Sequence, residues 1–235
     1  KSNFAESLIK KINGEFLLIA IDIEKNTLKI INDRFSSIPI YYAKINDTFL
    51  ASYAYNDLWL YLKEQNSIEL CLKSFYEMIH YRRIFGDKTY DKKSKFLSSA
   101  SILTLSSKSI LKSKYWKPNF KKINLSVNGA GKLLAARIKN SIKRKTSDRK
   151  KPGLFLSGGF DTRTILAAFD SKLICFTATY NTKGNREFEV AKLLTELKKD
   201  SHFHLQLADN HFTNIINKAV YQVGGMHQAN SIFMG

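Results

Sequence analysis

The segment Leu154–Ala168 constrains the fold of this chain more than any other part of its sequence. A hydrophobic run, Leu154–Leu156, leads directly into Ser157-Gly158-Gly159, and a helix-forming stretch begins at Thr162. Two adjacent glycines allow a tight turn in which backbone N–H groups point inward and form an anion-binding nest. The positive end of the following helix adds to this attraction. The segment therefore predicts a polyphosphate site at the C-terminal end of a central parallel strand.

Asp161 decides what kind of phosphate ligand fits this turn. Its negative charge repels a bare phosphate, so it favours a ligand whose phosphates carry a divalent cation that the carboxylate can bind. Ser157 and Thr162 supply hydroxyl groups beside it. The alternative is a tight strand-to-helix turn in which Asp161 only caps the helix. A Walker loop is excluded, because no Gly-Lys-Ser/Thr sequence follows the glycines.

Strands and helices alternate from Val127 onward, which predicts a parallel sheet with crossover helices. Apolar residues recur at helical spacing from Ala130 to Ile142, so a helix precedes the first strand. The expected strands are 154–156, 173–180 and 203–207, and the expected helices are 162–169, 187–197 and 212–223.

The residues before Pro118 have a different pattern, with short strands separated by turns. We expect strands at 16–22, 28–31, 39–43 and 48–52 in an antiparallel meander, helices at 55–64 and 70–83, and a hairpin within 98–113. A domain boundary is expected between Pro118 and Leu125. The fold class is α/β (α+β overall), with domains at 1–120 and 121–235.

The sequence Ser157-Gly158-Gly159-Phe160-Asp161-Thr162 resembles the PP-loop of ATP pyrophosphatases, whose pattern is SGGxDS. Thr162 replaces the last serine conservatively. Gly14-Glu15-Phe16, Asp22, Asn32–Phe35 and Pro39–Ala43 resemble the last strands of a class II glutamine amidotransferase domain. This order is similar to that of the asparagine synthetase family, and the resemblance covers nearly the whole chain. It implies a partial amidotransferase-type β unit followed by an adenine nucleotide alpha hydrolase-like unit.

The resemblance implies an ATP-dependent amide-forming ligase. In this family a carboxylate attacks the α-phosphate of ATP, pyrophosphate leaves, and ammonia from glutamine displaces AMP from the acyl-adenylate. The implied cofactors are ATP and Mg²⁺, and the implied partners are a small carboxylate (aspartate or another) and glutamine or ammonia. The sequence does not identify the acceptor carboxylate, and it leaves open whether the chain forms a homodimer.

The resemblance also implies roles for individual residues. Arg163 departs from the small residue that is usual in asparagine synthetases, and its guanidinium either contacts the pyrophosphate or points away from it. Glu187, four residues before Ala191, matches an acidic family position that we interpret as structural. The residues expected to hold pyrophosphate are Ser157, Gly158, Gly159, Asp161 and Thr162, with Asp161 at the metal and with backbone groups of Phe155 and Ala178 on the adenosine.

Several expected parts of such an enzyme do not occur in these 235 residues. The family's glutaminase reaction uses an N-terminal cysteine, whereas Cys71 and Cys175 lie inside the chain, where we expect both in the core. The later SGEGxDE motif is absent too. We expect the chain to be a fragment of a longer enzyme. The alternatives are a degenerate, non-catalytic nucleotide-binding module and a PP-loop enzyme that modifies tRNA.

The chain has 38 Lys and Arg residues against 20 Asp and Glu, a formal net charge of +18. The densest basic run is Lys139–Lys151. This excess either marks a nucleic-acid surface or reflects a composition rich in Lys, Ile and Asn throughout. We favour the second interpretation and expect the run to be a solvated helix flank and linker, with no nucleic-acid partner.

No run of about 18 apolar residues occurs, so no membrane partner is expected. Free cysteines favour a reducing compartment, and we expect the protein in the cytoplasm. His202 and His204 alternate at strand spacing, but no third ligand follows at a suitable distance, so we expect no metal site there.

Overall fold

The chain changes from antiparallel to parallel sheets along its length, which confirms the predicted α/β class. Its computed structural model describes residues 7–106, 109–148, 151–181 and 183–226. Contacts divide the chain into a first unit, Lys1–Phe120 with Phe212–Gly235, and a second unit, Lys121–His211. Whether these units correspond to the two expected domains stays a prediction. Among the described residues, no helix is both long and apolar enough to cross a membrane.

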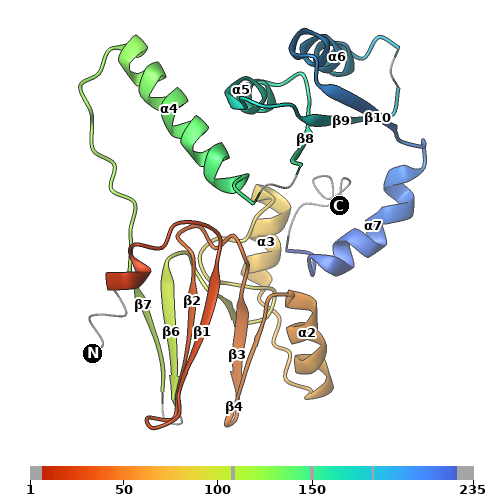
Figure 1. Cartoon of the computed structure of the whole chain (residues 1–235). Helices are drawn as coiled ribbons and strands as arrows, with labels where there is room; N and C mark the ends of the chain where they lie inside the picture. Colours follow the sequence, from red (N-terminus) through yellow and green to blue (C-terminus); the bar gives the residue numbers. More distant parts are fainter. Residues whose placement is uncertain (1–6, 107–108, 149–150, 182, 227–235) are drawn as a thin grey trace. The chain divides into compact units, whose positions relative to one another are not determined.

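Two antiparallel sheets form the first unit (Figure 1). One has the order β1 (Leu17–Asp22), β2 (Thr27–Asn32), β6 (Ser101–Ser106), β7 (Ile110–Lys114), and the other the order β4 (Thr48–Ser52), β3 (Tyr41–Ile45), β5 (Ser94–Phe96). The hairpins β1–β2, β3–β4 and β6–β7 agree with the sequence pattern.

The expected continuous meander is wrong, because β2 pairs with β6 rather than with β3. The reason is a shared core. Ile30 of β2, Leu103 of β6 and Tyr42 of β3 are all buried in one cluster, so the two sheets bury their apolar faces together. This pairing joins residues about 70 positions apart, and local periodicity carries no information about it.

Helices α2 (Tyr55–Glu64) and α3 (Leu72–Tyr81) follow β4, close to the predicted ranges. Tyr55, Leu58 and Leu62 lie on one face of α2 and are buried against β3. Helix α7 (His211–Gln222) ends in a turn that contacts the same region. A Cβ on Gly224 would lie 2.9 Å from the Cβ of Tyr55, and the Tyr90 hydroxyl donates to the Gly225 carbonyl at 2.8 Å. Close packing therefore requires glycine at position 224, where φ is also +59°.

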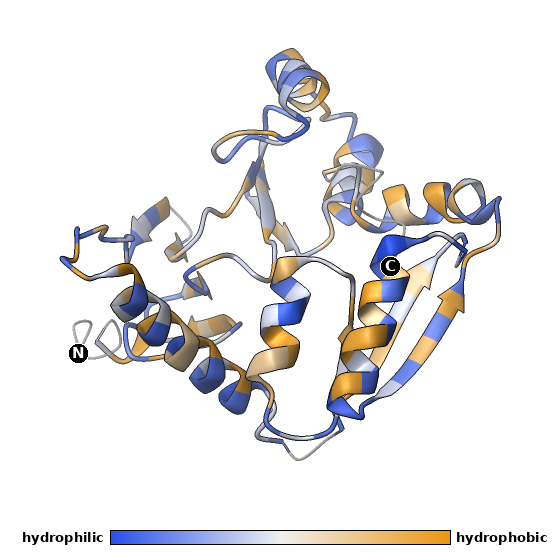
Figure 2. Ribbon diagram, turned by 90° about the horizontal axis from the view of Figure 1, so that it is seen from above, coloured by the Kyte–Doolittle hydropathy of each residue, from blue (hydrophilic) through white to orange (hydrophobic). Residues whose placement is uncertain are grey.

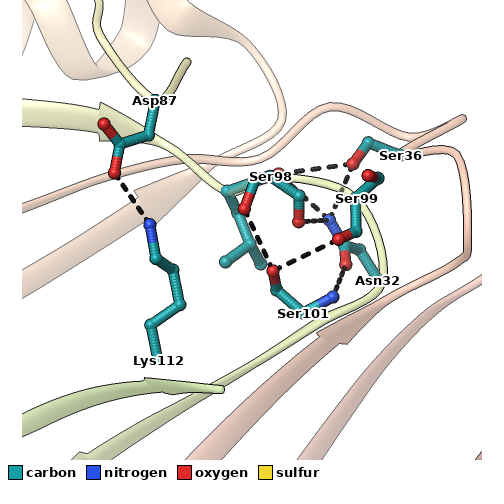
Figure 3. Close-up of polar contacts among 8 residues, drawn as sticks. Asn32, Ser36, Asp87, Ser98, Ser99, Ser101 and Lys112 are labelled. Atoms are coloured by element: carbon teal, nitrogen blue, oxygen red, sulfur yellow. Dashed lines mark hydrogen bonds and ion pairs between the residues drawn. The ribbon is translucent and has the colours of Figure 1, made fainter. Parts of the chain in front are cut away.

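A buried amide joins β2 to the segment that leads into β6 (Figure 3). The Asn32 side chain has no exposed surface, and its amide nitrogen donates to the carbonyl oxygens of Leu97 and Ser98, each at 3.0 Å. The same nitrogen donates to Ser36 Oγ at 2.9 Å, and the amide oxygen accepts from the Ser101 N–H at 2.8 Å. These bonds satisfy backbone groups that the sheets leave unpaired.

The second unit contains α4 (Val127–Lys145), β8 (Gly153–Phe155), α5 (Phe160–Ala168), β9 (Ile174–Thr179), α6 (Arg186–Lys198) and β10 (Ser201–Gln206). Every predicted strand and helix of this region is present within a few residues. The strands form one parallel sheet in the order β10-β9-β8. The expectation that the loop follows a central strand is wrong among the described residues, because β8 lies at the edge of this sheet.

One face of the parallel sheet carries the core of the second unit. Leu156, Cys175 and Ala191 are buried there together with Leu166, Phe169 and Leu173. On the opposite face, Phe155, Phe176 and Phe203 occupy neighbouring register positions and form a row of ring contacts. Figure 2 shows that each helix carries both hydrophobic and hydrophilic residues, which is typical of helices that bury one side and expose the other.

Candidate nucleotide site

The predicted phosphate loop lies between β8 and α5, at the carboxyl end of its strand (Figure 1). The hydroxyl of Thr162, in the first turn of α5, organises it. Thr162 Oγ1 lies 2.9 Å from the Ser157 carbonyl oxygen, 3.3 Å from the Ser157 N–H nitrogen and 3.1 Å from Ser157 Oγ. Threonine in place of the last serine of the SGGxDS pattern thus keeps a hydroxyl that closes the turn.

Gly158 is required by a close approach of α6. A Cβ at this position would lie 3.1 Å from Glu187 Cα and 3.3 Å from Val190 Cβ. Both atoms belong to the first turns of α6, so a side chain at 158 would push this helix away from the loop. The backbone at position 187 therefore helps to shape the loop, whereas a structural role for the Glu187 side chain stays a prediction.

Asp161 lies in the first turn of α5 with an exposed side chain. It makes no hydrogen bond or ion pair with any residue that the structure describes. The alternative in which Asp161 caps the helix is wrong, because the N-cap residue is Gly159 and no side chain caps the helix. The carboxylate is thus free to bind a cation at the positive end of α5. A single carboxylate fits Mg²⁺ that arrives with a nucleotide, because such ions take most ligands from phosphates and water.

Arg163 folds back on the loop. Its Nε donates to the Gly159 carbonyl at 3.3 Å, and its guanidinium lies 4.3 Å from the centre of the Phe160 ring. Neither contact neutralises the positive charge. The guanidinium thus stays beside the loop, where it raises the local positive potential.

Phe155 and Ala178 lie on the two strands that flank the loop. The Leu156 N–H donates to the Phe176 carbonyl at 2.7 Å, so the backbone groups of Leu156 point toward β9. Successive backbone groups of a strand point to opposite edges, and those of Phe155 therefore face the other side of β8. The backbone groups of Ala178 point the same way as those of Phe176, beyond the end of β8. Both positions can present main-chain groups to a ligand over the loop.

The two histidines of β10 contact threonines of β9. His202 Nε2 lies 2.8 Å from Thr177 Oγ1, and His204 Nε2 lies 2.8 Å from Thr179 Oγ1. Burial lowers the pKa of His202, and the neighbouring His204 lowers it further. No motif in the sequence marks these threonines, because a buried threonine in a strand carries no local signal. Across the described residues, no group of three or more His, Cys, Asp or Glu side chains is arranged to hold a metal ion.

Cys175 is buried in β9 as expected, and burial raises the pKa of its thiol. The expected burial of Cys71 is wrong, because this residue lies at the N-cap of α3 and is half-buried. Burial raises its pKa, but the bond from the Ser74 hydroxyl at 3.2 Å and the nearby Lys88 and Lys95 outweigh burial and lower it.

The basic run Lys139–Lys151 is helical as far as Lys145, and its residues 149 and 150 lie outside the described part. Ile142 packs against the core of the second unit, and the exposed Lys139 lies 3.3 Å from Asp170. These contacts account for the helix, and the absence of a nucleic-acid partner stays a prediction.

The first unit also holds a cavity of about 520 Å³ that the sequence did not indicate. Tyr41, Arg82, Arg83 and Lys88 are among its lining residues. They come from β3 and from the segment after α3, which no local motif connects.

Two comparisons with known proteins agree with this geometry. Residues 133–233 match the asparagine synthase family model, and this range includes the whole loop. The chain is also similar to asparagine synthetase [glutamine-hydrolyzing] 1 of Bacillus subtilis (strain 168), with 25% identity over 194 residues. The resemblance to asparagine synthetases is thereby confirmed. The aligned region covers 81% of this chain and 30% of the relative, so the chain spans less than a third of that protein.

Proposed function

We propose that this chain is part of an ATP-dependent amide-forming ligase of the asparagine synthetase type. The observation that carries this proposal is the loop between β8 and α5. Gly158 packs against α6, the Thr162 hydroxyl closes the turn, and Asp161 presents an unpaired carboxylate among the described residues. The loop lies within the region that matches the asparagine synthase model.

In this proposal the loop binds the pyrophosphate portion of ATP. The Gly158 N–H faces the phosphate oxygens, and the N-terminus of α5 adds positive potential. The N–H groups of Ser157 and Gly159 donate to Thr162 Oγ1 and Ser157 Oγ, each at 3.3 Å, and exchange these long hydrogen bonds for phosphate oxygens when the nucleotide binds. Asp161 is the residue that would hold Mg²⁺, which supplies charge neutralisation for the phosphates. Arg163, held beside the loop by Gly159 and Phe160, attracts the same charge. Main-chain groups of Phe155 and Ala178 bind the adenosine.

The proposed reaction is the one that the resemblance to asparagine synthetases implies. With the β- and γ-phosphates held by the loop, an oxygen of the substrate carboxylate attacks the α-phosphorus, and pyrophosphate leaves. Ammonia then attacks the acyl carbon and expels AMP, which forms an amide. The chain's contribution is to position the reactants and to stabilise the departing pyrophosphate.

The products test this proposal. The full-length protein is incubated with ATP, Mg²⁺, an ammonium salt and one of a panel of small carboxylates, including aspartate. We expect AMP and pyrophosphate in equal amounts, and only when the correct carboxylate is present. Formation of ADP and phosphate would contradict the proposal. Binding of Mg-ATP without turnover on any carboxylate would favour the degenerate nucleotide-binding module.

A further inference from the structure

A chain of three hydrogen-bonding groups links β10 to the start of the phosphate loop. Thr177 Oγ1 lies 2.7 Å from the Leu156 carbonyl oxygen and 2.8 Å from His202 Nε2. A carbonyl oxygen can only accept, so the single hydroxyl proton of Thr177 goes to Leu156. The hydroxyl oxygen must then accept from His202, whose Nε2 therefore carries a proton. This requirement assigns the ring tautomer.

This series of hydrogen bonds acts on the peptide group that opens the loop. The Leu156 carbonyl and the Ser157 N–H belong to the same planar peptide group. When Thr177 holds the carbonyl, the direction of the Ser157 N–H is set as well. That N–H meets Thr162 Oγ1 on the other side, at 3.3 Å. The peptide that opens the loop is thus held at both its carbonyl and its N–H group.

The surroundings keep the chain of groups in place. Thr177 is 4% exposed, so its hydroxyl does not exchange its partners freely for water. The His202 ring stacks on Phe188 of α6, with 5.7 Å between ring centres. Helix α6 also contacts Gly158, so the same helix supports the loop and the histidine that orders it.

We propose that Thr177 and His202 are positioning residues that fix the Leu156–Ser157 peptide and, through it, the turn of the phosphate loop that binds the nucleotide. The expected effect on ATP affinity rests on the proposed function. The effect on the structure of the loop does not depend on any nucleotide. Neither residue touches the phosphates. They act through the Leu156–Ser157 peptide.

The chain supplies a matched control on the same sheet. Thr179 lies two residues beyond Thr177 on the same buried face of β9, and its hydroxyl contacts His204 Nε2 at the same 2.8 Å. No described contact joins Thr179 Oγ1 to the loop. Thr177→Val and Thr179→Val therefore remove equivalent hydroxyl groups and equivalent histidine contacts, but only the first releases the loop.

The first measurement is amide hydrogen exchange at Ser157 and Gly159 in the full-length protein without nucleotide. We expect Thr177→Val to speed exchange at Ser157 by about three- to tenfold, as one lost hydrogen bond implies. Thr179→Val should leave it unchanged, and Thr177→Ser, which keeps the hydroxyl, should restore the slow rate. Equal exchange rates in the two valine variants would overturn the proposal.

The second measurement is calorimetric titration with Mg-ATP. Thr177→Val should weaken binding by about three- to tenfold relative to Thr179→Val. If the parent protein does not bind Mg-ATP, the proposed function fails while the exchange result still judges the positioning role. If Thr177→Val does not fold, His202→Phe replaces it, because phenylalanine keeps the stacking on Phe188 and removes the donor. His204→Phe is then the control, and equal effects of both would refute the inference.

Nitrogen chemical shifts of the histidine rings test the assigned tautomer directly. In the parent protein the proton of neutral His202 should reside on Nε2. A proton on Nδ1 instead would contradict the chain of bonds from which the proposal is argued.

Discussion

Gly158→Ala should destabilise the second unit, and Gly159→Ala should not. At both positions the backbone conformation suits alanine, because neither glycine has a positive φ. The difference lies in what the new methyl group meets. At 158 it would lie 3.1 Å from Glu187 Cα, 3.3 Å from Val190 Cβ and 3.4 Å from the Glu187 carbonyl oxygen. At 159 it would meet only Ser157 Oγ, at 3.2 Å, which can move by rotation of its side chain.

The magnitude follows from this contrast. Inserting one carbon into a packed site typically costs about 1–3 kcal/mol. Reduced freedom of the unfolded chain returns about 0.4–1 kcal/mol when glycine becomes alanine. We therefore expect a loss of about 1–2 kcal/mol for Gly158→Ala. For Gly159→Ala the same stabilisation through the unfolded chain offsets the weaker capping of α5 by alanine. The free energy of unfolding should therefore change by no more than about 0.5 kcal/mol.

Hydrogen exchange of β9 amides measures the free energy of opening the second unit. Tryptophan fluorescence is an internal control, because Trp59 and Trp116 both belong to the first unit and should report no change. The same loss of stability in both alanine variants would refute the reasoning, since it would show that contact with α6 does not distinguish the two glycines.

Three further changes test the packing of the two units, the first two in the first unit and the third in the second. Asn32→Leu should lower the free energy of unfolding in urea by about 2–5 kcal/mol, because it leaves buried backbone groups unpaired. Ser36→Ala should lower it by less than about 1 kcal/mol, and similar losses in the two variants would contradict the central role of the Asn32 amide. Lys88, 2.7 Å from Glu77, lowers the pKa of the Glu77 carboxylate, so the pair stabilises the fold fully above the unfolded pKa of about 4.3 and stops doing so as the pH falls through the lowered pKa. The melting temperature of Glu77→Gln should therefore depend less on pH in acid than that of the parent protein, and parallel curves for the two would argue against the pair. Lys198→Met should lower the free energy of opening the second unit, measured by hydrogen exchange of β9, by about 3 kcal/mol, because it removes the cation beside the fully buried Asp200 carboxylate. An unchanged free energy would show that the carboxylate is solvated.

The sequence predicted the second unit well because its signals are local. A hydrophobic strand, two glycines and a helix start are adjacent in the chain, and each has one dominant conformation. The arrangement of the first unit could not be predicted in this way. The β2–β6 pairing and the bonds from Asn32 to Leu97 and Ser101 connect residues 65 or more positions apart, and neither hydrophobic periodicity nor turn residues encode such pairs.

The candidate site shows the same limit. The residues that we propose to face the nucleotide form one motif, so the sequence could indicate them together. The residues that support the motif are not adjacent to it in the sequence. Val190 of the next helix meets Gly158, and Thr177 of the next strand holds Leu156. Their positions follow from parallel pairing of β8 with β9, so only the assembled sheet brings them to the loop.

In the proposed function Asp161 links the loop to a metal-bound nucleotide, and replacing it tests this central claim most directly. Calorimetric titrations compare the parent protein with Asp161→Asn, once with Mg-ATP and once with ATP in EDTA. The carboxylate should attract the nucleotide through Mg²⁺ and repel it without the metal. We predict that Asp161→Asn weakens Mg-ATP binding by about 1–3 kcal/mol and leaves metal-free ATP binding unchanged or stronger. Equal weakening in both buffers would contradict a metal-binding role for Asp161.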